Sequence, residues 1–266
     1  MPRAPKRWRE AEARDLPAFS ALVEAKWREW TDADGHDIEP WFRGHADASL
    51  SLAPGLYRPP FDRVDEDQYR HEFRLRAHPF LHDATSYPRS EWDFYFLMQH
   101  YGLPTRLLDW SESALVGLYF AVMRRPHDSC PRSVWVLQPW KLNAHVAKIG
   151  DRLTAYDHRL VQQYLWPVWK KRNARLPAGP VAFEPPHNSK RLAAQRGEVT
   201  IHGRDRRGLE TYGSLKIGLV KIVIPPDAKR TIRRQLATAG ITEGAIFPNL
   251  SGLSSEIKEG WSYDVQ

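Results

Sequence analysis

The chain has 266 residues, of which 42% are hydrophobic and 12% aromatic, and it carries a formal net charge of +7. This length fits one large domain or two small ones, with a sizeable core. Membrane-spanning helices need roughly 18 uninterrupted apolar residues, and no stretch approaches this. The charged opening MPRAPKRWRE lacks the apolar part of a secretory signal, so we expect a cytoplasmic protein without a membrane partner. A lone Cys130 excludes an internal disulfide or a thiolate metal cluster.

Positive charge is concentrated in residues 170–234, which hold 16 Lys and Arg residues against 5 Asp and Glu residues. The rest of the chain is therefore slightly acidic. An anionic partner, such as a nucleic acid or a phosphorylated small molecule, would meet this basic segment. The alternative is a solvated basic face without a ligand.

In the first half of the chain, apolar spacing predicts helices over residues 15–30, 65–77, 90–100 and 113–124. The last of these is too uniformly apolar for a surface helix. Asp15 and Ser90 are suitable N-cap residues. Between the first two helices, Trp41 to Gly44 predicts a short strand that ends in a turn.

In the second half, β-branched and aromatic residues predict strands over residues 133–138, 199–202 and 218–224. Helices are expected over residues 151–171, with a kink at Pro167, and over residues 227–240, whereas four prolines predict a loop over 176–189. We therefore expect an α+β fold in one compact domain, with a small, split, mostly antiparallel sheet surrounded by helices. Strands separated by helices also permit an α/β fold.

Three segments together resemble a known family. They are Trp41-Phe42-Arg43-Gly44, then residues 99–110 (QHYGLPTRLLDW) running into 114–121 (ALVGLYFA), and finally residues 191–197 (RLAAQRG). In this order and spacing they resemble the FRG domain, a mainly bacterial family named for its Phe-Arg-Gly motif. The resemblance implies an N-terminal helical extension over 1–36, an FRG domain over 37–255 and a tail over 256–266. The chain departs from the family pattern at His45, where Gln is common, and at Glu198, where an aromatic residue is common.

Arg43 and Gly44 are candidates for binding a cofactor. An arginine at the end of a strand presents a planar fork of donors to a phosphate or carboxylate, and the adjacent glycine allows close approach of a ligand. The alternative is a buried arginine paired with Asp109 or Glu72.

The central segment places His100, Thr105 and Arg106 on a loop constrained by Gly and Pro, where functional groups concentrate. We expect Asp109 to point away from its apolar neighbours and to fix Arg106 or a histidine. The alternatives are a structural ion pair between Arg106 and Asp109, and a His100 that is protonated only because it ends a helix.

Gln195 and Glu198 lie near the start of the strand predicted over 199–202, where an amide and a carboxylate could project into one cleft. Arginines nearby in sequence are expected to favour the ionised form of Glu198. The alternative is a surface glutamate that balances those arginines.

The order of these residues is similar to that of the arginine class of ADP-ribosyltransferases. That similarity implies that Arg43 holds the pyrophosphate of NAD, that Thr105 supplies the hydroxyl of the nicotinamide pocket and that Glu198 stabilises the charge on the ribose as nicotinamide leaves. Tyr119 would follow as the aromatic residue of the pocket. A metal site is not expected, because Pro79 interrupts the helical spacing of His78 and His82.

Two functions remain open. The first is an NAD-dependent ADP-ribosyltransferase or NAD-cleaving enzyme, with nucleic acid as the expected acceptor and with a role as a toxin or anti-phage effector. The alternative is a non-catalytic module that binds a nucleotide or nucleic acid, in which the family motifs are scaffold.

Overall fold

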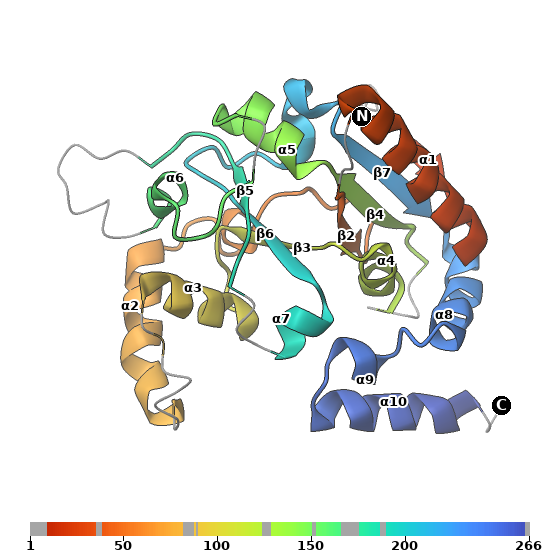
Figure 1. Ribbon diagram of the computed structural model, residues 1–266. Coiled ribbons are helices and arrows are strands. Elements are labelled where there is room, and N and C mark those ends of the chain that lie inside the picture. The colour runs from red at the N-terminus through yellow and green to blue at the C-terminus, as the bar shows by residue number, and fades with distance from the viewer. Residues whose placement is uncertain are drawn as a thin grey trace.

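A seven-stranded sheet forms the centre of the computed structural model, in the order β1-β7-β4-β2-β3-β6-β5 (Figure 1). The structure describes residues 10–35, 39–81, 88, 90–123, 129–150, 153–165, 176–186 and 190–263. Neighbouring strands are antiparallel, except that β1 and β7 are parallel. The expected α+β fold with a mostly antiparallel sheet is confirmed.

The strands are β1 (Glu10–Glu12), β2 (Trp41–His45), β3 (Leu107–Ser111), β4 (Arg132–Leu137), β5 (Val181–Phe183), β6 (Gly197–Ile201) and β7 (Leu219–Ile224). The helices are α1 (Leu16–Asp34), α2 (Glu66–Ala77), α3 (Glu91–His100), α4 (Ala114–Met123), α5 (Pro139–Leu142), α6 (Arg159–Gln162), α7 (Lys190–Ala194), α8 (Lys229–Thr238), α9 (Glu243–Ile246) and α10 (Leu250–Tyr263).

Strands β2 and β3 pair over a much shorter length than the neighbouring strands do. Only Phe42 and Ser111 pair there, whereas five residue pairs join β2 to β4 and five join β3 to β6. The sheet is therefore larger than expected and is continuous, but it nearly divides at this junction.

Each face of the sheet has its own packing. On one face, Phe42 and Val134 pack beneath α1, α4 and α8, which lie together on the right of Figure 1. Further along the same face, Leu107 and Val199 pack against residues of α3 in a separate cluster. The opposite face buries Trp41, Trp110 and Trp135 in a third cluster. Between the two clusters of the first face, Asp109 of β3 is exposed.

The predicted N-caps explain where two helices begin. Asp15 accepts a hydrogen bond from the Ala18 amide at 2.8 Å. Ser90 and Asp93 form a reciprocal capping box at the start of α3. These contacts satisfy backbone donors that the first turn leaves unpaired.

Some predicted elements are wrong. In the described part of residues 151–171, the long helix is replaced by the four-residue α6 and by an isolated bridge between Ala155 and Glu184, while Pro167 lies outside the described residues. The predicted loop over 176–189 contains β5, which lies between prolines and pairs with β6. Strands β1 and β3 and helices α9 and α10 were not predicted, because their stretches are short or weakly patterned.

Gly44 allows α4 to approach the sheet. A Cβ atom at this position would lie 2.2 Å from the Gly117 carbonyl oxygen and 2.4 Å from the Ala121 nitrogen. These are backbone atoms of α4, which cannot move aside separately from the helix. The missing side chain thus admits a helix, and the space expected for a ligand at Gly44 is occupied.

Gly44→Ala should destabilise the protein by about 3 kcal/mol, because the new methyl group forces α4 away from β2. Gly213→Ala is the matched control, since a Cβ atom there meets nothing within 4 Å. Its stability should stay within about 0.5 kcal/mol of the wild type. Urea denaturation measures both, and equal stability of the two variants would contradict the close packing of α4 on β2.

Candidate functional site

Asp109 is exposed to solvent although β3 is an inner strand of the sheet. The other four residues of β3 are buried, and β2 and β6 flank the strand on its two sides. The side chain points away from Leu108 and Trp110, as predicted, and emerges on the face that carries the two separate clusters. Solvent therefore reaches the middle of the sheet at this carboxylate.

A short chain of hydrogen bonds holds the Asp109 carboxylate. The Gln99 side-chain amide donates to Asp109 Oδ2 at 2.8 Å. Thr105 donates in turn to the Gln99 amide oxygen, and its own hydroxyl accepts the Leu107 amide at 3.1 Å. Thr105 is 1% exposed. Its hydroxyl therefore orients Gln99, and the role expected for it in contact with a ligand is wrong.

Arg43 bridges β2 and β3 where their pairing stops. Its Nη1 donates to the Asp109 backbone carbonyl at 2.5 Å, and its Nε donates to His45 Nε2 at 3.3 Å. Burial and the Arg43 charge lower the pKa of His45 to about 3, so His45 is neutral and can accept that bond. Arg43 thus contacts the Asp109 carbonyl instead of its carboxylate, and Glu72 pairs with Arg76 instead.

His100 and Arg191 complete the group at the end of α3. Arg191 Nη1 donates to the His100 carbonyl oxygen at 3.4 Å. Burial and the Arg191 charge lower the pKa of His100, which Asp109 only partly offsets. His100 is therefore neutral near pH 7, contrary to the alternative of a protonated helix end. We call Gln99, His100, Asp109 and Arg191 the polar seam.

Glu198 lies on the other face of the sheet. It pairs with Trp110 across β3 and β6, and cross-strand partners share a face, so it points away from Asp109. The residue is 4% exposed. Burial raises the pKa of Glu198 to about 9, and neighbouring carboxylates add to this shift. The expectation of an ionised Glu198 is wrong.

The three residues expected around NAD lie on different parts of the sheet. Strand β3 separates Arg43 on β2 from Glu198 on β6. Thr105 precedes Trp110 by five residues, a span of about 16 Å along an extended chain. The structure brings Gln99 and His100 to Asp109 on one face, whereas Arg43, which pairs with Trp135, and Glu198, which pairs with Trp110, both point to the opposite face.

Arg106 is a structural residue. It is 1% exposed and forms an ion pair with Glu66 of α2 at 2.7 Å. Its guanidinium also donates to the carbonyl oxygens of His202 at 2.8 Å and Tyr164 at 2.5 Å. The predicted pairing of Arg106 with Asp109 is wrong, since Glu66 takes that place.

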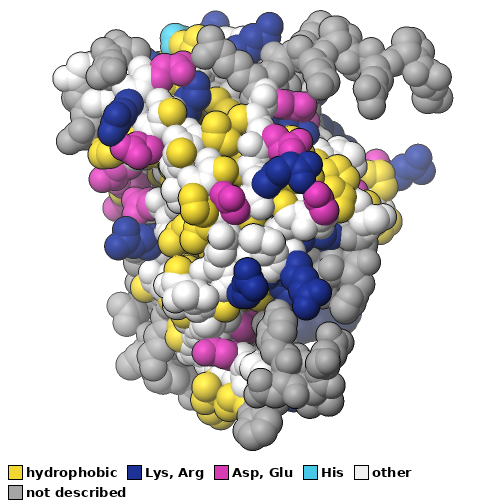
Figure 2. Space-filling view, turned by 90° about the vertical axis from the view of Figure 1, so that its right-hand side faces the viewer, with side chains coloured by type: hydrophobic (Ala, Val, Ile, Leu, Met, Phe, Trp, Pro, Cys, Tyr) yellow, Lys and Arg dark blue, Asp and Glu magenta, His cyan; other side chains and the backbone are white. Residues whose placement is uncertain are grey.

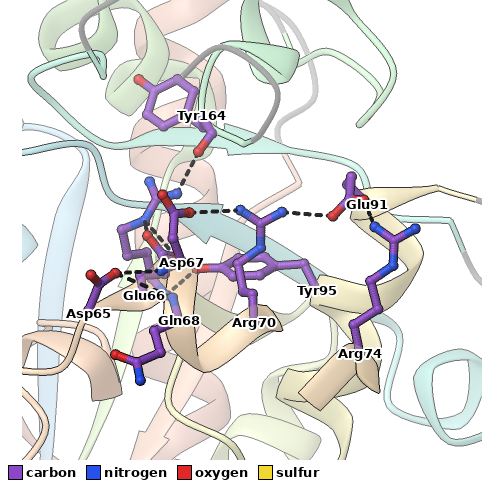
Figure 3. A network of polar contacts seen from close by, with 10 residues as sticks. Asp65, Glu66, Asp67, Gln68, Arg70, Arg74, Glu91, Tyr95 and Tyr164 are labelled. Carbon is purple, nitrogen blue, oxygen red and sulfur yellow. Dashed lines mark hydrogen bonds and ion pairs between the residues drawn. The ribbon is translucent and has the colours of Figure 1, made fainter. Parts of the chain in front are cut away.

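The contacts of Glu66 belong to a larger network that joins α2 to α3 (Figure 3). Arg70 reaches both Asp67 at 3.5 Å and Glu91 at 2.8 Å, and Glu91 also contacts Arg74. Tyr95 donates to Glu66 at 2.5 Å and accepts the Arg106 amide. This network fixes the start of β3, and with it the position of Asp109.

Tyr119 and Gln195 contact the C-terminal part of the chain. Tyr119 is 2% exposed and donates to Glu243 of α9. The Gln195 amide donates to the Ile246 carbonyl at 3.3 Å. Both hold α9 in place, so neither faces the polar seam as a ligand-binding group.

The basic segment 170–234 is spread over several parts of the molecule. Arg191 stacks on Phe247 at 4.9 Å, whereas Arg207 pairs with Asp205 at 2.7 Å. Other basic residues lie on α8, and residues 170–175 lie outside the described residues. On the face that carries α1, side chains of both signs are interspersed (Figure 2). On this face, the described residues form no continuous basic field (Figure 2).

A cavity of about 300 Å³ lies beside Arg106. Its wall contains Arg204 and Arg206, together with four acidic side chains at and before the start of α2. Arg206 also stacks on Tyr57 at 5.3 Å. Because both charges are present, this cavity does not provide a basic surface for nucleic acid.

In the part of the chain that the structure describes, no group of three or more His, Cys, Asp or Glu residues could hold a metal ion. His82, one half of the spaced histidine pair, lies outside the described residues. Among the described helices, none has the length and apolarity to cross a membrane.

Gln99 and Arg191 were not singled out as functional residues from sequence. Both belong to the motif segments, but nothing local indicated that they approach Asp109 from α3 and α7. The usable signal was Asp109 itself, a carboxylate within an otherwise apolar strand.

Glu198 should make stability depend on pH. Its pKa is about 9 in the folded chain against an ordinary value of 4.5, so the folded chain holds one more proton between these pH values. The free energy of unfolding should therefore fall by a few kcal/mol as the pH rises through this range. Glu198→Gln stays neutral and should show a flatter profile in urea denaturation. Parallel profiles for the two proteins would show that Glu198 does not titrate abnormally.

Comparison with known families adds one finding. Residues 39–130 match the model of the FRG domain. No curated protein and no solved structure matches the chain. The matched region includes three of the four polar-seam residues, and the extension of the domain to residue 255 stays a prediction. This chain therefore contains an FRG domain over residues 39–130.

Proposed function

We propose that the polar seam binds a phosphate-bearing nucleotide, with NAD as the first candidate, and that Asp109 is the carboxylate that acts on the ribose. The observation that carries this proposal is the exposure of Asp109 in the middle of a packed sheet. A carboxylate in such a position, held by Gln99, is oriented for a ligand and has no role in the core.

The surroundings of Asp109 match the three parts of a nucleotide. Arg191, which donates to the His100 carbonyl, supplies positive charge for phosphate, because guanidinium groups bind phosphate through paired donors. Asp109 can accept hydrogen bonds from ribose hydroxyls. The Tyr101 ring is 69% exposed, and its centroid lies 5.1 Å from that of His100, which supports stacking of a base.

The same arrangement supports cleavage of NAD. Loss of nicotinamide leaves positive charge on the ribose, and a fixed carboxylate stabilises such a transition state. Asp109 is accessible there, whereas Glu198 is buried with a pKa of about 9. The neutral His100 would serve as the base that accepts a proton from the acceptor. The nature of the acceptor, and a role as a toxin or anti-phage effector, stay predictions.

Substitutions at three positions test these roles. Arg191→Ala should weaken NAD binding at least about tenfold in calorimetry, because a charged hydrogen bond is lost. Asp109→Asn should keep binding within about threefold but lower nicotinamide release at least about 100-fold, since its charge acts mainly in the transition state.

Glu198→Gln is the matched control for Asp109→Asn, because each change replaces a carboxylate by its amide. Glu198→Gln should retain nicotinamide release. Loss of release in Glu198→Gln, with full release in Asp109→Asn, would return the catalytic role to Glu198. If wild-type protein binds neither NAD nor ADP-ribose, the nucleotide proposal is wrong.

A further inference from the structure

A second, separate cavity lies between α1 and the start of α4. It has a volume of about 500 Å³. Val23 and Trp27 form one wall on a single face of α1, and Leu115 lines the opposite side. Phe42 provides part of the floor. We call this cavity the α1 groove.

The α1 groove combines an apolar interior with an acidic rim. Among the described residues, Glu24, Glu39 and Glu112 line it together with Arg196, and Glu24 is paired with Arg28 on the surface of α1. The chain as a whole carries a net charge of +7, so this local excess of negative charge opposes the overall balance. The negative electrostatic potential of these carboxylates reaches Glu198. Burial raises the pKa of Glu198, and the charges of Glu112 and Glu39 raise it further.

Trp27 adds an aromatic surface beside these carboxylates. Its side chain is 42% exposed, although Trp30 on the same helix is 4% exposed. An exposed indole ring attracts a cation over its face, and Trp is the strongest of the aromatic residues in this interaction. Carboxylates and an indole ring around one apolar space thus select a cation that has an apolar stem.

We propose that the α1 groove binds a lysine or arginine side chain presented by a basic peptide segment of a partner protein. The aliphatic stem of such a side chain packs on Val23, Phe42 and Leu115, while its charged end meets the carboxylates. The volume also admits an apolar residue next to the basic one. This proposal concerns a different surface from the polar seam and does not depend on nucleotide binding.

Binding of a labelled peptide tests the charge requirement. The probe is Ala-Gly-Arg-Leu-Gly-Ala with an uncharged N-terminal fluorophore, and its partner probe carries citrulline, the neutral isostere, in place of arginine. Fluorescence anisotropy with the full chain should show at least about tenfold tighter binding of the arginine peptide. Equal binding of the two peptides, or no binding of the arginine peptide, would overturn the proposal.

Variants locate the site. Glu39→Gln combined with Glu112→Gln should reduce the preference for arginine to below about threefold, and Trp27→Leu should weaken the arginine peptide several-fold. Glu72→Gln, an exposed acidic residue on α2, is the control and should leave the preference unchanged. If the double variant fails to unfold cooperatively, Glu24→Gln on the surface of α1 provides the same comparison. A full preference retained in Trp27→Leu and in the folded glutamine variants would show that the peptide binds elsewhere.

Discussion

The separation of β2 from β3 determines where solvent reaches the sheet. Backbone pairing between these strands is limited to Phe42 and Ser111, and the guanidinium of Arg43 then reaches the Asp109 carbonyl in place of further pairing. A buried carbonyl without a donor is costly, so this contact lets the two strands diverge. The divergence leaves two separate clusters on one face and an exposed Asp109 between them.

The three residues of the Phe-Arg-Gly motif have different structural roles. Phe42 belongs to the core beneath α4, Arg43 points to the other face and donates to the Asp109 backbone carbonyl, and Gly44 permits the close approach of α4. The central motif is divided in the same way. Thr105 orients Gln99 toward Asp109, whereas Arg106 turns toward Glu66 and anchors α2. Adjacent residues of one motif therefore have different roles: some contact the residues around Asp109, and others hold the helices on the sheet.

Local patterns predicted the elements that have strong periodicity or clear caps, such as α1, α3 and β7. They failed where pairing over long distances decides the structure, as for β5, whose three residues pair with β6. The same contrast between local patterns and long-range pairing applies to the candidate site. The orientation of Asp109 was predicted from its apolar neighbours, but the burial of Glu198 depends on β3, β5 and neighbouring acids that are distant in the sequence.

Carboxyl accessibility tests the central claim most directly. Carbodiimide coupling of glycine ethyl ester to the native protein, followed by peptide mass spectrometry, compares Asp109 with Glu198 under identical conditions. The structure predicts rapid labelling of Asp109, little labelling of Glu198, and protection of Asp109 by saturating NAD. An unreactive Asp109 in the native chain, or labelling that NAD leaves unchanged, would contradict a nucleotide site at the separation of β2 from β3.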